Sequence, residues 1–256
     1  MRVVITGAAG VIGSVLRDGL SDRHEIVGID RRRTDDRSLR RVDMTRAKAA
    51  GDAMFEGADA IVDLAASPKL ETPWSEVWKN NLPATMNALE AARRHGVKRV
   101  VYASSNHVVG LYERDAPYAQ IVAGELAGLD PATVPKLDSS SPIRPDSPYA
   151  IGKATGEAAA RHYSEEFELS AICLRIGTVL ADDTPTRPRH FATLLTHGDL
   201  VRLCEAALGG PDEVRFGIYY GVSANTWRFW DLEEARHEIG YEPQDDAERL
   251  RPRGSG

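Results

Sequence analysis

A tyrosine and a lysine four residues apart, Tyr149 and Lys153, carry side chains suited to acid–base chemistry. This spacing places both on one face of a predicted helix that runs from about 149 to 165. Because a neighbouring ammonium favours the ionised phenol, we expect Tyr149 to accept a proton near neutral pH. Ser105 ends the apolar run 98–105, and we expect its hydroxyl to hold a substrate oxygen. These three residues predict proton removal from a substrate hydroxyl.

A glycine-rich turn near the start of the chain predicts where a cofactor would bind. Gly7, Gly10 and Gly13 follow the β-branched run 3–5 and open a segment with helical spacing of apolar residues. Glycines without a Cβ let the backbone approach a pyrophosphate, and free N–H groups at the start of the helix face the negative charge. The alternative is an ordinary tight turn between strand and helix. The context favours dinucleotide binding.

Asp30 ends the next apolar run, 25–30, about twenty residues after the glycines. A carboxylate there would accept hydrogen bonds from the adenosine ribose and repel a 2′-phosphate, which favours NAD over NADP. Arg31 and Arg32 follow directly and carry charges that would neutralise such a phosphate. Asp43 closes a predicted short strand at 41–44, where it either meets the adenine amino group or caps the helix starting near Thr45.

Strands that alternate with helices predict a doubly wound parallel α/β sheet of the Rossmann type, with ligands at the carboxyl ends of the strands. The chain divides into a nucleotide-binding core with the catalytic helix and a carboxyl-terminal part that completes the sheet and forms a small substrate lobe. The stretch from 106 to 148 shows no strand and is expected to cover the substrate. The predicted strands are 3–5, 25–30, 41–44, 60–66, 98–105, one near 174 and one in 213–221, and the predicted parts are 1–169 and 170–256.

Composition narrows the class of protein. The chain is 42% hydrophobic and 27% charged, with a net charge of −6 that argues against a nucleic-acid partner. No apolar run approaches the length of a membrane span, no signal peptide is recognisable, and we expect a cytoplasmic location. Cys173 and Cys204 lie in apolar stretches and are expected in the core of a protein from a reducing compartment. No His/Cys cluster has metal-ligand spacing, so no metal is predicted.

Several motifs resemble those of the extended, epimerase-like branch of the short-chain dehydrogenase/reductase superfamily. The segments 103–107, 144–147, 174–177 and 220–225 are similar to those of uronate dehydrogenases and of haloarchaeal NAD-dependent glucose-6-phosphate dehydrogenases. The resemblance implies a catalytic triad of Ser105, Tyr149 and Lys153. We expect NAD to contact Gly7, Gly10, Val11, Ile12, Gly13, Asp30, Arg31, Asp43, Met44, Leu64, Ala65, Ala66, Asn81, Tyr149, Lys153 and Ile176. Substrate contacts are expected from Ser67, Ser105, Asn106, His107, Tyr149, Thr178 and Arg189.

The resemblance also implies that Arg189 grips a substrate carboxylate, with Arg187 as a rival because the preceding loop differs in length. A simpler alternative is a surface arginine that pairs with Asp182 or Asp183. For the pair at 106–107, the alternative is that both side chains only close the turn after the strand.

The reaction predicted from these features is NAD-dependent oxidation of a cyclic aldose, a hexuronate or a hexose phosphate, at C1 to a lactone. One alternative is a sugar-nucleotide epimerase or dehydratase, which returns the hydride to its substrate. A second is a non-catalytic NAD-sensing regulator on the same fold. The binding partner is expected to be a small sugar acid or sugar phosphate. Neither a nucleic acid nor a membrane is expected as a partner. The chain is expected to form a homo-oligomer.

Overall fold

The computed structural model describes residues 1–251, which build one seven-stranded sheet in which every paired strand is parallel. The strand order is β3-β2-β1-β4-β5-β6-β7, so the predicted doubly wound sheet is confirmed. Its order reverses between β1 and β4, which is where ligands bind in sheets of this kind. The strands are β1 (Arg2–Thr6), β2 (Glu25–Asp30), β3 (Arg40–Arg41), β4 (Ala60–Asp63), β5 (Arg99–Ser105), β6 (Ser170–Ile176) and β7 (Phe216–Gly221).

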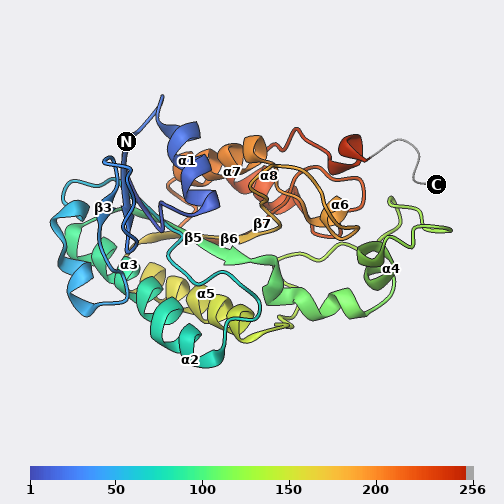
Figure 1. The fold of residues 1–256 in the computed structure, drawn as a ribbon, viewed down its shortest axis with the longest axis horizontal. Helices are drawn as coiled ribbons and strands as arrows, with labels where there is room; N and C mark the ends of the chain where they lie inside the picture. The colour runs from blue at the N-terminus through green and yellow to red at the C-terminus, as the bar shows by residue number, and fades with distance from the viewer. Residues whose placement is uncertain (252–256) are drawn as a thin grey trace.

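Helices cover both faces of the sheet (Figure 1). One face carries α1 (Val11–Leu20), α7 (His197–Gly209) and α8 (Glu233–Ile239), and the other carries α2 (Trp74–Glu76), α3 (Leu82–His95) and α5 (Pro148–Glu166). Every residue of β5 and β6 is buried, as expected for central strands of a sheet with two covered faces. Cys173 and Cys204 are buried and unpaired, which confirms the expectation that they are core residues.

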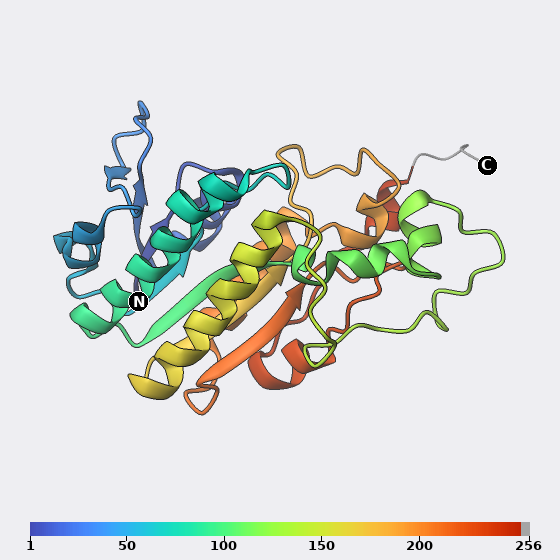
Figure 2. The ribbon, with the colours of Figure 1, turned by 90° about the horizontal axis from the view of Figure 1, so that it is seen from below.

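The excursion after β5 lies beyond the carboxyl ends of the strands. It contains the 3₁₀ segment η4 (Asn106–Arg114) and the short helix α4 (Tyr118–Ala123), which packs beside α6 (His190–Thr193) (Figure 2). The sequence predicts a short helix over 118–129, and the structure confirms its start at Tyr118. The helix ends earlier than predicted, because Gly124 takes a left-handed conformation (φ 79°) and ends α4. The 3₁₀ turns of η4 were also not predicted. Three further 3₁₀ segments are η1 (Ala47–Gly51), η2 (Ala53–Phe55) and η5 (Ala247–Leu250).

Two other elements differ from the sequence prediction. The third strand pairs only through Arg40–Arg41, so Asp43 lies beyond the strand. Met86, Leu89 and Ala92 share one face of a crossover helix that the sequence predicts over 78–95. In the structure the segment η3 (Val77–Asn81) is a π-helical turn, and the regular α3 starts at Leu82. A π turn contains one residue more than an α turn, so it changes which side chains face the sheet.

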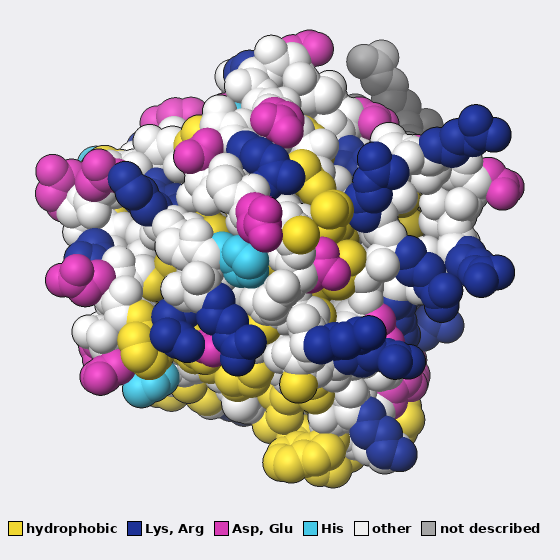
Figure 3. Space-filling view, turned by 90° about the vertical axis from the view of Figure 1, so that its left-hand side faces the viewer, with side chains coloured by type: hydrophobic (Ala, Val, Ile, Leu, Met, Phe, Trp, Pro, Cys, Tyr) yellow, Lys and Arg dark blue, Asp and Glu magenta, His cyan; other side chains and the backbone are white. Residues whose placement is uncertain are grey.

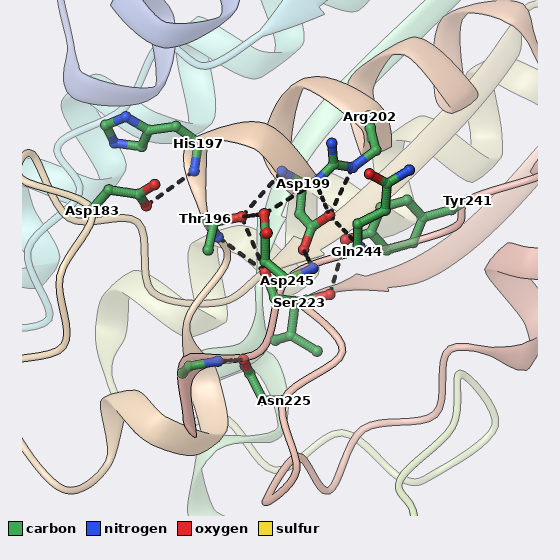
Figure 4. A network of polar contacts seen from close by, with 12 residues as sticks. Asp183, Thr196, His197, Asp199, Arg202, Ser223, Asn225, Tyr241, Gln244 and Asp245 are labelled. Carbon is green, nitrogen blue, oxygen red and sulfur yellow. Dashed lines mark hydrogen bonds and ion pairs between the residues drawn. The ribbon is translucent and has the colours of Figure 1, made fainter. Parts of the chain in front are cut away.

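A network of side chains anchors the carboxyl-terminal segment to the sheet (Figure 4). The fully buried carboxylate of Asp199, in α7, accepts the backbone N–H groups of Gln244 (2.8 Å) and Asp245 (3.0 Å). Asn225 donates to two carbonyl groups at the end of α6 (3.2 and 2.8 Å) and accepts the N–H of Ala247 (2.9 Å). Buried polar groups with complete hydrogen bonding fix one arrangement of the segments that they join.

The sheet continues without a break from β5 through β6 to β7, so strands after residue 169 complete it. The boundary between the parts 1–169 and 170–256 stays a prediction. The last five residues of the second part, 252–256, lie outside the described residues. Among residues 1–251, no helix has both the length and the apolar character that crossing a bilayer requires. In the same range, His, Cys, Asp and Glu side chains form no group of three that could hold a metal ion.

Candidate active site

A single cavity of about 840 Å³ lies at the carboxyl ends of the strands, where the sheet order reverses. It extends from the glycine turn after β1 to the end of β6, and its size is typical of a cofactor site. The cavity brings together most of the residues predicted for cofactor and substrate. Those in its wall are Gly7, Gly10, Val11, Ile12, Gly13, Asp30, Arg31, Asp43, Met44, Leu64, Ala65, Ala66, Ser67, Ser105, His107, Tyr149, Lys153, Ile176 and Thr178.

The glycine turn has the shape that a pyrophosphate requires. Gly7 has a positive φ of 64°, and a Cβ there would lie 2.9 Å from the carbonyl oxygen of Leu64. A Cβ on Gly13 would lie 2.7 Å from the Cα of Ala8, so only glycine allows α1 to pack so closely against the turn. Since α1 has no side-chain cap and no acidic residue in its first turn, its first N–H groups are available to an anion. The turn therefore fits a dinucleotide.

Asp30 lies at the end of β2 with 6% of its surface exposed. Its carboxylate accepts the backbone N–H of Ala9 (3.0 Å) and both the backbone N–H (2.8 Å) and the guanidinium of Arg32. Burial raises the pKa of Asp30, but the hydrogen bonds from Arg32 and Ala9 outweigh it, so the pKa is lowered. The group is therefore a carboxylate at neutral pH, as ribose binding requires. Basic side chains are spread over the face that carries β3 (Figure 3).

Asp43 lines the cavity, where its contact with adenine stays a prediction, but it does not cap η1, because that segment starts at Ala47 with Arg46 as its N-cap. Its carboxylate accepts the backbone N–H (3.1 Å) and the hydroxyl (2.8 Å) of Thr45, so it closes the turn before η1 while lining the cavity. Asn81, by contrast, does not line the cavity, whereas Asn80 does. The Asn81 side chain instead binds both the N–H (2.8 Å) and the carbonyl (3.2 Å) of Ser67. Asn81 thus positions the loop after β4, and its contact with NAD stays a prediction.

Ser105, Tyr149 and Lys153 come together on β5 and α5, as predicted. The Ser147 hydroxyl caps α5 by accepting the N–H of Ala150 (3.2 Å), which fixes where the helix starts. The Ser105 hydroxyl accepts the N–H of His107 (3.2 Å) at the start of η4. All three side chains line the cavity.

The ionisation of Tyr149 differs from the sequence prediction. Burial raises its pKa to about 12, although a hydrogen bond with Ser105 acts in the opposite direction. The Lys153 ammonium does not counter this, because it donates to the carbonyl of Ala103 and lies 5.8 Å from the centre of the Tyr149 ring. Burial also lowers the pKa of Lys153 to about 8. In this structure the phenol therefore keeps its proton at neutral pH, which corrects the expectation of a tyrosine ionised by its neighbour.

A buried ion pair holds α5 against the sheet beneath these residues. Arg175 of β6 donates twice to Glu157 of α5, with both distances 2.9 Å. Glu157 also accepts the Ser104 hydroxyl (2.6 Å), and Arg175 donates to the Tyr220 hydroxyl (3.0 Å). The two charged side chains are 1% and 6% exposed. The pair joins three neighbouring strands to α5 and so fixes the distance between β5 and the catalytic helix.

Of the other residues predicted to contact the sugar, His107 and Thr178 line the cavity, whereas Arg189 and Asn106 do not. The Nδ1 of His107 is 2.6 Å from the carboxylate of Asp146, which orients the ring. Asn106 is 1% exposed, and its side-chain N–H₂ has no partner among the described residues. Neither placement tests the predicted substrate contacts, which stay predictions.

Arg189 pairs with neither of the aspartates considered for it. Its guanidinium binds the carboxylate of Glu113 through two contacts of 2.7 Å and reaches the Thr178 hydroxyl at 3.2 Å. Asp183 instead accepts the backbone N–H of His197 (3.0 Å), at the start of α7 (Figure 4). Arg187, the alternative to Arg189 as the residue that grips a substrate carboxylate, is exposed.

Sequence reasoning missed three acidic residues of this region, namely Glu113, Asp146 and Glu157. Asp146 stands in a motif that was noted, and its approach to η4 requires Gly110, where a Cβ would lie 2.0 Å from the carboxylate. The proximity of a glycine and an acid so far apart in the chain is visible only in the fold. Nothing in the sequence around Glu113 or Glu157 indicates their arginine partners.

Comparison with known proteins agrees with this geometry. The chain is 34% identical to the uronate dehydrogenase of Pseudomonas syringae over 98% of its length and 84% of the relative's. It is 29% identical to the NAD-dependent glucose-6-phosphate dehydrogenase of Haloferax volcanii, over 96% of this chain and 94% of the relative's length. It is 32% identical to the L-arabinose 1-dehydrogenase (NAD(P)(+)) of the same organism, with 96% and 97% covered.

A crystal structure of a mutant uronate dehydrogenase from Agrobacterium tumefaciens, complexed with NAD, has a TM-score of 0.80 and 29% identity, with 98% of this chain and 90% of that chain covered. The model of the NAD dependent epimerase/dehydratase family matches residues 3–198. The resemblance derived from the sequence motifs is therefore confirmed, and the relatives are NAD-dependent sugar dehydrogenases. This chain belongs to the NAD-dependent epimerase/dehydratase family, the extended branch of the short-chain dehydrogenases/reductases.

Proposed function

We propose that this protein oxidises a cyclic aldose at C1 with NAD and releases a lactone and NADH. The observation that carries the proposal is one continuous cavity that holds a nucleotide turn at one end and Ser105, Tyr149 and Lys153 further along. NAD, when bound, accepts the hydride that leaves C1. The sequence-based expectation for the sugar is a hexuronate or a hexose phosphate, and the relatives' names also include a neutral pentose.

The side chains of this protein supply binding and proton transfer. Ser105, fixed by its contact with His107, holds the hydroxyl on C1. Tyr149, once its phenol has lost its own proton, takes the hydroxyl proton as hydride leaves C1 and the C1–O bond becomes a carbonyl. Lys153 is buried beside Tyr149, where it provides positive charge and a ribose contact. The carboxylate of Asp30 accepts hydrogen bonds from the adenosine ribose, and the start of α1 binds the pyrophosphate.

NADH release tests this proposal against an epimerase, which keeps the hydride in its cycle. Purified protein is incubated with NAD and a panel of hexuronates, hexose phosphates and free aldoses, while absorbance and sugar consumption are followed together. We expect one NADH for each sugar consumed and an aldonic or aldaric lactone as product. Isomerised sugar without free NADH would replace the proposal by an epimerase, and NAD binding without any turnover would favour a sensor.

Two matched variants assign the turnover to the site. Tyr149→Phe removes the proton acceptor and is expected to lower kcat by about 10²–10⁴-fold while NAD still binds. Tyr163→Phe removes a hydroxyl from the same helix that contacts Glu90 (3.3 Å), outside the cavity, and is expected to retain activity. The homo-oligomer stays a prediction that sedimentation of the purified protein would test.

A further inference from the structure

The guanidinium of Arg189 is fully engaged by its neighbours. Its Nε and Nη2 atoms each lie 2.7 Å from one oxygen of Glu113, in the two-point geometry that makes arginine–carboxylate pairs strong. Its third nitrogen, Nη1, contacts the hydroxyls of Thr178 (3.2 Å) and Thr193 (3.5 Å). The side chains of Arg189 and Glu113 are only 23% and 15% exposed. A substrate anion that used Arg189 would have to displace a carboxylate already held in that position.

The groups around this pair leave no free positive charge. The charge of Arg189 helps to lower the pKa of the nearby Asp146 carboxylate. Burial raises the pKa of Asp146, but the hydrogen bond and charge of His107 outweigh it, so the pKa is lowered and the group is ionised. Glu113 and Asp146 thus compensate the charges of Arg189 and His107. An added carboxylate or phosphate would find no unpaired cation here.

The loop after β4 does not add a net positive charge to the cavity wall either. Lys69 and Glu71, in the loop after β4, both line the cavity and have opposite charges. Among the described residues, the other cations in the wall are Lys153, buried below the catalytic tyrosine, and Arg31 and Arg32 at the adenosine end. The sugar end thus lacks an uncompensated cation.

We propose that the sugar site accepts a neutral aldose, without a carboxylate or phosphate, and that Glu113 excludes anionic sugars by occupying Arg189. This inference rests on the proposed oxidation at C1 and revises the expected class of sugar. Hydroxyl groups suit the region, because Thr178 and His107 offer uncharged hydrogen-bonding atoms in the wall. The Glu113–Arg189 pair thereby sets specificity through charge.

Binding can be measured without turnover in the Tyr149→Phe protein saturated with NAD. Matched sugars are titrated in pairs, glucose against glucuronate and glucose 6-phosphate, and galactose against galacturonate, with binding followed by NMR. We expect the neutral member of each pair to bind at least about tenfold more tightly, and wild-type kcat/KM to follow the same order. If the charged member binds and reacts equally well or better, this inference is wrong while the proposed function stands. If no sugar binds or reacts, both are wrong.

Glu113→Gln keeps the shape of the side chain and releases the charge of Arg189. Its kcat/KM for the charged sugars, relative to the neutral ones, is expected to rise about 10- to 100-fold. The double variant Glu113→Gln/Arg189→Gln should lose that gain. Glu90→Gln makes the same change in a surface pair with Arg93 and Arg94 and should not alter the ratio. If Glu113→Gln folds but its kcat/KM ratio of charged to neutral sugars is unchanged, the inference is wrong. If the variant does not fold, the titrations of paired sugars described above decide the question.

Discussion

The free protein is expected to hold Tyr149 as a neutral phenol throughout the pH range in which it is stable. Burial raises the pKa of Tyr149 to about 12, above the usual value of 10.0 for a tyrosine phenol. At about 1.4 kcal/mol per unit, this corresponds to an additional cost of roughly 3 kcal/mol for forming the phenolate. At pH ~8, four units below the pKa, only about one molecule in 10⁴ carries the phenolate. Oxidation therefore requires conditions that make deprotonation easier.

The near-ultraviolet absorbance of phenolate measures this directly. The pH titration of wild-type protein without cofactor is compared with that of Tyr149→Phe, and the difference isolates one side chain. We expect no difference signal up to pH ~10, because ionisation of Tyr149 lies above that value. With NAD and sugar, kcat/KM should rise with pH toward the alkaline side by up to about tenfold per unit. A difference signal with a midpoint at or below pH ~9 would refute the reasoning from burial.

Three further changes have defined outcomes. Asp30→Ala removes the ribose acceptor and leaves Arg32 without its partner. The kcat/KM ratio of NAD to NADP should therefore fall about tenfold or more, and an unchanged ratio would show that Asp30 does not discriminate between the cofactors. Glu157→Gln leaves the buried Arg175 without its counter-charge and should cost about 3–5 kcal/mol in the free energy of unfolding, measured with denaturant, while a loss below ~1 kcal/mol would contradict the burial argument. Gly13→Ala places a Cβ 2.7 Å from backbone atoms and should weaken NAD binding in calorimetry, and wild-type affinity would mean that α1 can move away at no cost.

Features that depend on neighbours in the chain could be predicted from the sequence. The glycine turn and Asp30 belong to one strand–helix–strand unit, so their spacing alone places them around the same cavity. Tyr149 and Lys153 share a helix face for the same reason. Ser105 follows from the end of a central strand, because carboxyl ends of parallel strands meet at one edge.

Features that depend on distant residues could not be predicted. Glu113 and Arg189 are 76 positions apart, and nothing local in either segment indicates that they meet. The pKa of Tyr149 is raised by burial, and the four-residue spacing to Lys153 carries no information about burial. The contact of Asn81 with Ser67 likewise joins residues 14 positions apart, and the π turn over Val77–Asn81 that precedes α3 has no local signal in the sequence.

The anchored carboxyl-terminal segment allows the loop before α6 to vary independently of the sheet. Asp183 is tied to the start of α7 through His197, and Asn225 holds the end of α6, so the connection from 184 to 188 lies between two fixed points (Figure 4). Loop length between fixed ends costs little free energy, about 0.6 kcal/mol for each doubling. Relatives on this fold can therefore lengthen, shorten or exchange that connection, and with it the approach to Arg189, without disturbing the sheet or the catalytic helix.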